Sequence, residues 1–139
     1  MWIVAINSWK WESGTMKNCS FVHQLKNDSY GLHERIERGI TVCDKEGKIL
    51  QMNDKSQKTN HGDLVGQNVL DCHPEPARTK LVQLMEEHAT NAYTIEKNGV
   101  KKLIYQTPWY ENGEFMGLVE FSLEIPFEMP HYIRKPKME

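Results

Sequence analysis

The sequence has few cysteines. Its 139 residues contain three, Cys19, Cys43 and Cys72, and none of them has a close cysteine neighbour. Small secreted domains are held together by paired cysteines, whereas unpaired thiols persist in reducing compartments. The cysteine content therefore excludes a disulfide framework and predicts a cytoplasmic protein.

Long apolar runs and an excess of one charge are also missing. No stretch approaches the roughly 20 apolar residues that a membrane-spanning helix needs, and the apolar opening at residues 1–6 is too short for a signal-peptide core. The 17 basic and 19 acidic residues give a net charge of −2, so no strong attraction to nucleic acid or to an anionic membrane is expected. The length suits a single domain.

Catalytic motifs are absent as well. The sequence has no nucleophile elbow, no phosphate-binding loop and no quartet of residues at zinc-binding spacing. We therefore expect a protein that is not an enzyme and that has no metal site built from such a motif.

Residues 39–54, GITVCDKEGKILQMND, predict a β-hairpin. The polar segment DKEGK separates two apolar runs, and Gly47 can adopt the positive φ that a tight turn needs. Asn53 and Asp54 follow the second run, and their short polar side chains suit a helix N-terminus. The segment therefore predicts two antiparallel strands followed by a helical turn.

Helical patterns occupy the middle of the chain. Residues 55–60 predict a short polar helix, and the residues around Leu64 and Val65 predict another. Pro74 or Pro76 suits the first turn of a longer helix, which we expect to end near residues 90–91. Its apolar stripe, at helical spacing, consists of Ala77, Leu81, Leu84, Met85 and His88.

Three strands follow, from about Ala92 onward, and the dipeptides Asn98-Gly99 and Asn112-Gly113 are typical of the tight turns between strands. At the other end of the chain, residues 1–15 are interpreted as an extension, and residues 21–36 predict a helical segment that is broken near Gly31. The order of elements indicates an α+β protein with a mostly antiparallel sheet.

These motifs, taken in order, resemble the PAS sensor-domain family. The similar features are the hairpin at residues 39–54, the segment DLVGQNVLDCHP at residues 63–74, the longer helix and a three-strand meander, over roughly residues 39–125. The resemblance is to PAS modules with a Cys-His-Pro motif. It implies a five-stranded antiparallel sheet with short helices and one longer helix on its concave face, plus an N-terminal helical segment. The expected domains are an N-terminal extension and helical cap at 1–38, a PAS-like domain at 39–126 and a C-terminal tail at 127–139.

In this family, the concave side of the sheet forms a pocket that holds haem, flavin, a small organic ligand or nothing. Family members that are linked to an effector leave the last strand through a continuous signalling helix, but Pro126 and Pro130 prevent such a helix here. The resemblance therefore implies a stand-alone sensor that binds a small-molecule ligand. We expect it to act as a homodimer or on a separate signalling protein.

Two histidines are candidates for chemistry. His73 belongs to the Cys72-His73-Pro74 motif, and imidazole is a common axial ligand of haem; the alternative is that His73 caps the following helix and that Cys72 is a small buried residue. His88 either faces the pocket or is an ordinary core residue. Two alternatives to the ligand-binding sensor therefore remain: a haem-based redox or gas sensor using His73 or His88, and a small enzyme using one of them as a general base.

Aromatic and polar residues alternate along the fourth predicted strand of the domain. Tyr105, Thr107 and Trp109 share one face of it, and they either line the ligand pocket or belong to ordinary sheet core or a dimer face. A period of two does not decide which face looks inward. The predicted ligand-binding residues are Tyr105, Thr107, Trp109, Phe121, Leu84, His88, Cys72 and His73.

Overall fold

The computed structural model describes residues 11–12, 15–16 and 32–137. The chain divides into two compact units, residues 1–33 and 34–139. In the first unit, two short strands pair antiparallel: β1 (Trp11–Glu12) and β2 (Thr15–Met16). The remainder of the predicted extension and the predicted helical residues up to Gly31 lie outside the described residues.

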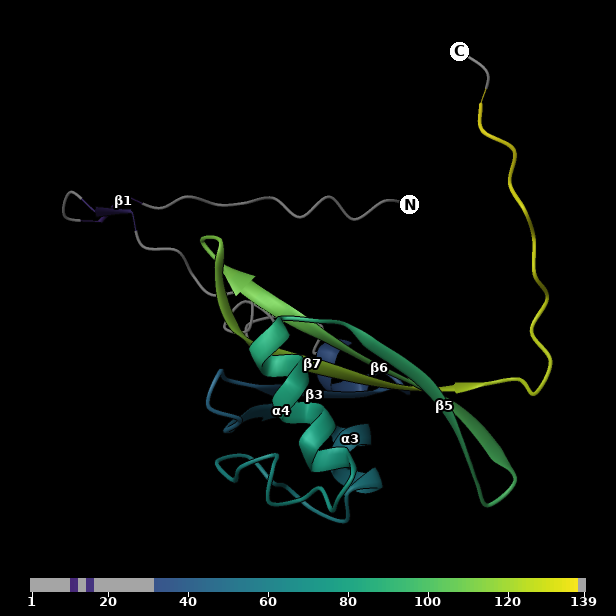
Figure 1. The fold of residues 1–139 in the computed structure, drawn as a ribbon, viewed down its shortest axis with the longest axis horizontal. Coiled ribbons are helices and arrows are strands. Elements are labelled where there is room, and N and C mark those ends of the chain that lie inside the picture. Colours follow the sequence, from purple (N-terminus) through teal and green to yellow (C-terminus); the bar gives the residue numbers. More distant parts are fainter. Residues whose placement is uncertain (1–10, 13–14, 17–31, 138–139) are drawn as a thin grey trace. The chain divides into compact units, whose positions relative to one another are not determined.

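The second unit contains a five-stranded sheet in the order β4-β3-β7-β6-β5, and every neighbouring pair is antiparallel. This confirms the α+β fold that the motif order predicted. Short helices and one longer helix accompany the sheet (Figure 1). The elements are β3 (Gly39–Cys43), β4 (Ile49–Met52), α3 (Asp54–Thr59), α4 (Ala77–Glu87), β5 (Asn91–Lys97), β6 (Val100–Glu111) and β7 (Glu114–Ile125), and α2 (Leu32–Arg35) lies at the boundary between the two units.

The hairpin turns follow from local chemistry. In the β3–β4 turn, Asp44 Oδ1 accepts hydrogen bonds from the backbone N–H groups of Glu46 (3.0 Å) and Lys48 (2.8 Å). In the two later turns, both residues of the Asn98-Gly99 and Asn112-Gly113 pairs have positive φ. This backbone twist matches the right-handed twist of the flanking strands, which is why Asn-Gly dipeptides favour such turns.

Asn53 connects α3 to the first strand of the sheet. Its Oδ1 accepts hydrogen bonds from the N–H groups of Ser56 (3.0 Å), in the first turn of α3, and of Ile40 (2.9 Å), in β3. Its Nδ2 donates to the carbonyl of Arg38 at 2.6 Å. Because Asn53 is fully buried, these bonds replace the water that its amide loses on folding. The predicted helix N-terminus at this position is confirmed.

The predicted short helix around Leu64 and Val65 is wrong. Residues 60–76 form turns, and Gly66 has a φ of +90° that no helix accommodates. The backbone of this loop bonds to the edge of β4 instead, through Ile49 N–H to Gln67 O (2.8 Å) and Gly66 N–H to Ile49 O (2.8 Å). The loop therefore protects an edge strand whose backbone groups would otherwise be exposed to pairing with another chain.

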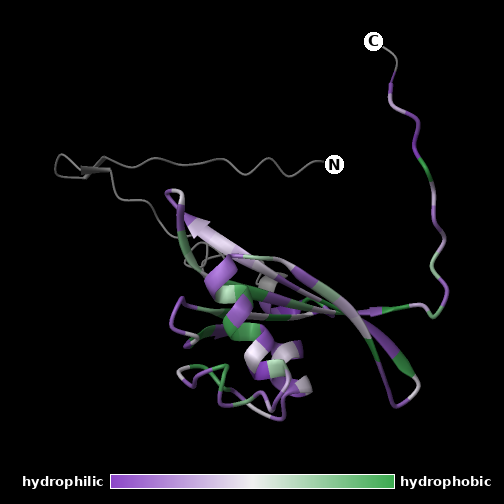
Figure 2. Ribbon diagram, in the orientation of Figure 1, coloured by the Kyte–Doolittle hydropathy of each residue, from purple (hydrophilic) through white to green (hydrophobic). Residues whose placement is uncertain are grey.

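Helix α4 is confirmed but is shorter than predicted. It ends at Glu87 because His88 adopts a left-handed conformation (φ 50°) as its C-terminal cap, so His88 is not part of the apolar stripe. Leu81 and Leu84 are the buried residues of α4, and they pack against Cys43 and Leu118 of the sheet. Helix α4 carries both hydrophobic and hydrophilic residues (Figure 2), and its buried residues Leu81 and Leu84 are three positions apart, as on one face of an amphipathic helix.

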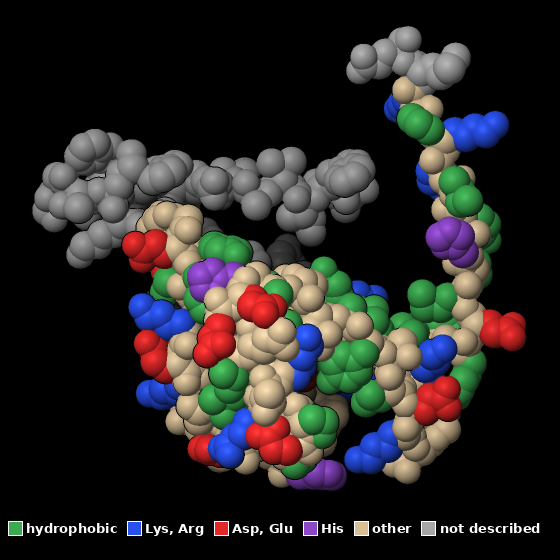
Figure 3. Space-filling model, viewed as in Figure 1, with side chains coloured by type: hydrophobic (Ala, Val, Ile, Leu, Met, Phe, Trp, Pro, Cys, Tyr) green, Lys and Arg blue, Asp and Glu red, His purple; other side chains and the backbone are tan. Residues whose placement is uncertain are grey.

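Two further observations concern the distribution of charge and the length of the helices. Basic and acidic side chains are interspersed over the face seen in Figure 3 and do not gather into a patch of one sign. In the described part of the chain, no helix is both long enough and apolar enough to cross a membrane.

Candidate functional site

The sheet has one face covered by helices, which we call the inner face. Gln106 on β6 and Glu120 on β7 are cross-strand partners on this face, and Gln106 Nε2 donates a hydrogen bond of 2.7 Å to Glu120 Oε2. The other end of the Gln106 amide is also fixed, because Asn91 Nδ2 on β5 donates to Gln106 Oε1 at 3.0 Å. Three neighbouring strands thus contribute one polar row, Asn91–Gln106–Glu120, which ends in a carboxylate.

Beside this row lies a small pocket of about 70 Å³. Its walls are mainly apolar and come from α4, from the loop that precedes it and from the strands, with Leu81, Val69 and Leu118 as examples. Glu120 and Gln106 reach the same pocket. It therefore has room for a small apolar group next to a carboxylate.

A larger groove of about 280 Å³ adjoins the pocket. Its lining includes Tyr93 and Ile95 of β5, which are 44% and 39% exposed. The groove and the pocket share four lining residues, so we treat them together as the cleft; the shared residues are Thr41, Asn60, His73 and Glu120.

Polar side chains of β3, of α3 and of the loop before α4 also line the cleft. Thr41 Oγ1 and Ser56 Oγ are 2.6 Å apart, which joins β3 to α3. His73 Nδ1 lies 2.7 Å from the carbonyl oxygen of Val69. Because a carbonyl oxygen only accepts, Nδ1 of His73 carries a proton and donates it to this oxygen.

The Glu120 charge acts on its surroundings. The pKa of Tyr93 is raised, first because burial disfavours the phenolate and second because the negative charge of Glu120 repels it. The ion pairs among the described residues join Lys55 to Glu37 and Glu124, and Arg78 to Asp71. None of them involves Glu120.

Comparison with solved structures identifies the architecture. The PAS domain of BvgS from Bordetella pertussis aligns with a TM-score of 0.54 at 19% identity, over 74% of this chain and 87% of that one. A PAS domain from a protein of Colwellia psychrerythraea aligns at 0.51 and 20% identity, over 73% and 97%, and the PAS domain of an HTR-like protein from Haloarcula marismortui at 0.53 and 13%, over 75% and 94%. The chain has a PAS fold. Neither the family models nor the curated proteins give a match.

Four of the predicted ligand-binding residues lie on the opposite, outer face of the PAS-fold sheet. Gln106 points into the cleft, so its neighbours Tyr105 and Thr107 point away, and Phe121 is the cross-strand partner of Tyr105. Trp109 continues the same alternation, and its indole Nε1 donates to the carbonyl of Cys43 at 3.0 Å. These four side chains do not meet the cleft.

The other four predicted residues lie on the helical side. Cys72 and His73 do line the cleft; Cys72 is exposed rather than buried, and His73 bonds to the loop rather than capping α4, whose cap residue Pro76 makes no side-chain hydrogen bond. Leu84 belongs to the core. The ring of His88 stacks on Phe115 with 3.9 Å between centroids, so the two candidate histidines do not share one site.

Sequence reasoning missed Glu120, Gln106 and Tyr93. The only available signal was the pairing of two polar residues at the centres of adjacent strands, and it was hidden because the outer-face positions of β6 and β7 are more apolar than the inner ones. An apolar row on a strand usually indicates the buried face, and here it misleads.

The cleft does not fit a haem. The apolar pocket of about 70 Å³ has room only for a small group, and the ring of His88 is stacked on Phe115. Among the described residues, no group of three or more His, Cys, Asp or Glu is arranged to hold a metal ion.

Proposed function

We propose that this chain is a sensor or interaction module that binds a small molecule in the cleft and has no catalytic activity of its own. The observation that carries this proposal is the polar row Asn91–Gln106–Glu120, which aims a carboxylate into a partly apolar cleft. A few oriented polar groups in an otherwise apolar concavity are characteristic of small-molecule sites.

The cleft is suited to transmit a signal because its walls belong to different elements. His73 and Asn60 come from the loop and from the end of α3, whereas Glu120 comes from the sheet. A ligand that contacts both walls favours one packing of the helical side on the sheet over others. Its binding therefore shifts the population of conformations by the difference in its affinity for them.

The outer face offers a surface for the response. Tyr105, Phe121 and Leu123 form part of an apolar row there, and Tyr105 is 39% exposed. Exposed aromatic residues are enriched at protein interfaces. We infer that the module responds by dimerising or by docking on a separate signalling protein through this face, in the cytoplasm, where the thiols of Cys43 and Cys72 stay reduced.

Native mass spectrometry of freshly purified protein tests the binding function. We expect a retained small-molecule mass, and we expect this mass to be lost in an Ile95→Trp variant, whose larger side chain fills part of the groove. Glu96→Trp is the matched control, because Glu96 is the next exposed residue of β5 and is not part of the cleft.

A protein that carries no extra mass, and whose melting temperature is unchanged across a library of small metabolites, would contradict ligand binding. The same spectra report whether the chain is a dimer. A monomer at all concentrations would remove the homodimer and leave a separate partner.

A further inference from the structure

We propose that the ligand of the cleft is a small organic cation, an amine or amidine with a short apolar group, whose charged head pairs with Glu120. This inference rests on the proposed ligand-binding function and specifies the chemical class of the ligand.

Glu120 is held in position but is not neutralised by its protein partner. Gln106 donates one hydrogen bond to Oε2, and Gln106 is itself 4% exposed and is fixed by Asn91. An amide carries no net charge, and a carboxylate has about four acceptor positions. Glu120 therefore keeps its charge and most of its acceptor capacity for a group that enters the cleft.

Among the described residues, no basic side chain forms an ion pair with Glu120. Lys55 forms ion pairs with Glu37 and Glu124. Lys97 and Lys102 also line the groove, and neither forms an ion pair with Glu120.

Another part of the wall also favours a cation. Tyr93 lines the same groove as Glu120, and the face of an aromatic ring attracts an organic cation. The apolar pocket of about 70 Å³ has room for a short alkyl chain. An anionic ligand would be attracted by Lys97 and Lys102 but would have to lie beside the Glu120 carboxylate, which the butyrate probe below tests, and a metal ion lacks a set of ligands among the described residues.

Three probes of nearly equal size separate the ligand classes: n-butylammonium, n-butanol and butyrate. Binding to the full chain is followed by backbone amide chemical shifts in NMR. We expect n-butylammonium to shift the amides of Thr41, Tyr93 and Glu120 and to bind at least tenfold more tightly than the other two. Its affinity should fall as salt is raised, because a charge pair is screened.

Two variants locate the charge. Glu120→Gln keeps an oxygen that can accept from Gln106 but removes the charge, and we expect it to weaken n-butylammonium binding at least tenfold without changing n-butanol binding. Glu124→Gln makes the same change four residues away on β7, outside the cleft lining, and should bind n-butylammonium like the original protein. Thermal unfolding shows whether each variant is folded, and the salt dependence tests the charge pair in the unmodified protein.

The outcomes separate this inference from the proposed function. If n-butanol or butyrate binds in the cleft as tightly as n-butylammonium, the cleft binds ligands and the cationic class is wrong. The cationic class is also wrong if the Glu120→Gln variant is folded and binds n-butylammonium with unchanged affinity. It is wrong as well if none of the three probes binds. In each of these cases, native mass spectrometry of the Ile95→Trp and Glu96→Trp variants tests whether the cleft binds a ligand, independently of the charge of that ligand.

Discussion

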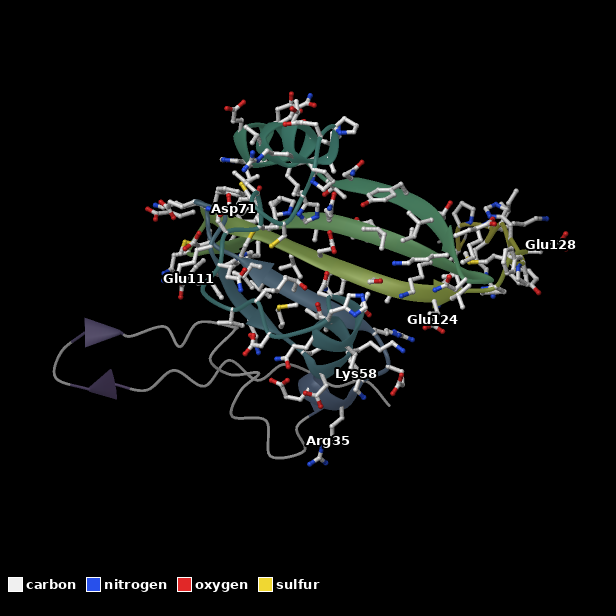
Figure 4. All side chains as sticks on the ribbon, turned by 90° about the horizontal axis from the view of Figure 1, so that it is seen from below. Arg35, Lys58, Asp71, Glu111, Glu124 and Glu128 are labelled. Atoms are coloured by element: carbon white, nitrogen blue, oxygen red, sulfur yellow. The ribbon has the colours of Figure 1, made fainter. Side chains whose placement is uncertain are left out.

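The two ends of the inner face differ in what covers them. At one end, Leu81 and Leu84 of α4 pack on Cys43 and Leu118, and all four are at most 5% exposed. At the other end, near the β5–β6 turn, Tyr93 and Ile95 are 44% and 39% exposed. Figure 4 shows the two ends, with Asp71 and Glu111 labelled at the first and Glu124 and Glu128 at the second.

The difference follows from element lengths. Helix α4 has 11 residues and spans about 16 Å, whereas β6 has 12 residues and spans about 40 Å. One such helix covers less than half of the strand, and the β5–β6 hairpin projects past it (Figure 1). The open end should therefore be accessible to a ligand, and stability should concentrate at the covered end, which three predictions test.

The largest expected effect comes from shortening a buried side chain at the covered end. Leu84 is 2% exposed, so Leu84→Ala removes packing that the site cannot refill and should lower the free energy of unfolding by about 3–5 kcal/mol. Ile95→Ala at the open end should cost about 0.5 kcal/mol or less, because a surface side chain makes few contacts. Urea denaturation measures both. Equal losses would mean that the open end is also packed.

A glycine at the covered end should be the next most sensitive. Gly117 has a φ of +142°, and a Cβ at this position would collide with the backbone of Cys43 and Asp44. Gly117→Ala should therefore cost about 2–4 kcal/mol, from backbone strain and overpacking together.

Gly113→Ala is the matched control, because Gly113 also has positive φ but has nothing within 4 Å of the added carbon. Only the strain of about 1–2 kcal/mol should appear there. If the two variants lose the same stability, the close approach of β7 to Cys43 is absent in solution.

The smallest effect is a dependence of stability on pH. Burial, above all, raises the pKa of the Cys43 thiol from 9.0 to about 11. The unfolded chain therefore loses this proton at lower pH than the folded chain, so the contribution of Cys43 to stability is fully present below pH 9 and is lost as the pH rises toward 11. Between pH 8 and 10, the original protein should lose about 1 kcal/mol more than Cys43→Ala.

Tyr93→Phe gives the corresponding measurement at the open end. The pKa of Tyr93 is also raised, so its contribution to stability is likewise lost at high pH. Since Tyr93 is 44% exposed, we expect this variant to flatten the pH dependence less than Cys43→Ala does. A larger effect from Tyr93 than from Cys43 would reverse the proposed order of the two ends.

Local chemistry made much of the fold predictable. Asn98-Gly99 and Asn112-Gly113 adopt the backbone conformations that their dipeptides favour, and Asn53 begins α3 as its side chain allows. The end of α4 was less predictable, because His88 stacks on Phe115, a residue of a distant strand. The loop around Leu64 was also mispredicted, since its backbone bonds to β4 rather than to itself.

The sequence by itself determined the antiparallel strands, their turns and the helix that crosses them, because these depend on residues close together in the chain. Only the tertiary structure decided which face of the sheet forms the cleft. Alternation divides β6 into a face with Tyr105 and a face with Gln106. The period of two is the same whichever of these faces turns toward the helices. The choice depends on where Leu81 and Leu84 of α4 pack, and that contact with Cys43 and Leu118 joins residues far apart in the sequence.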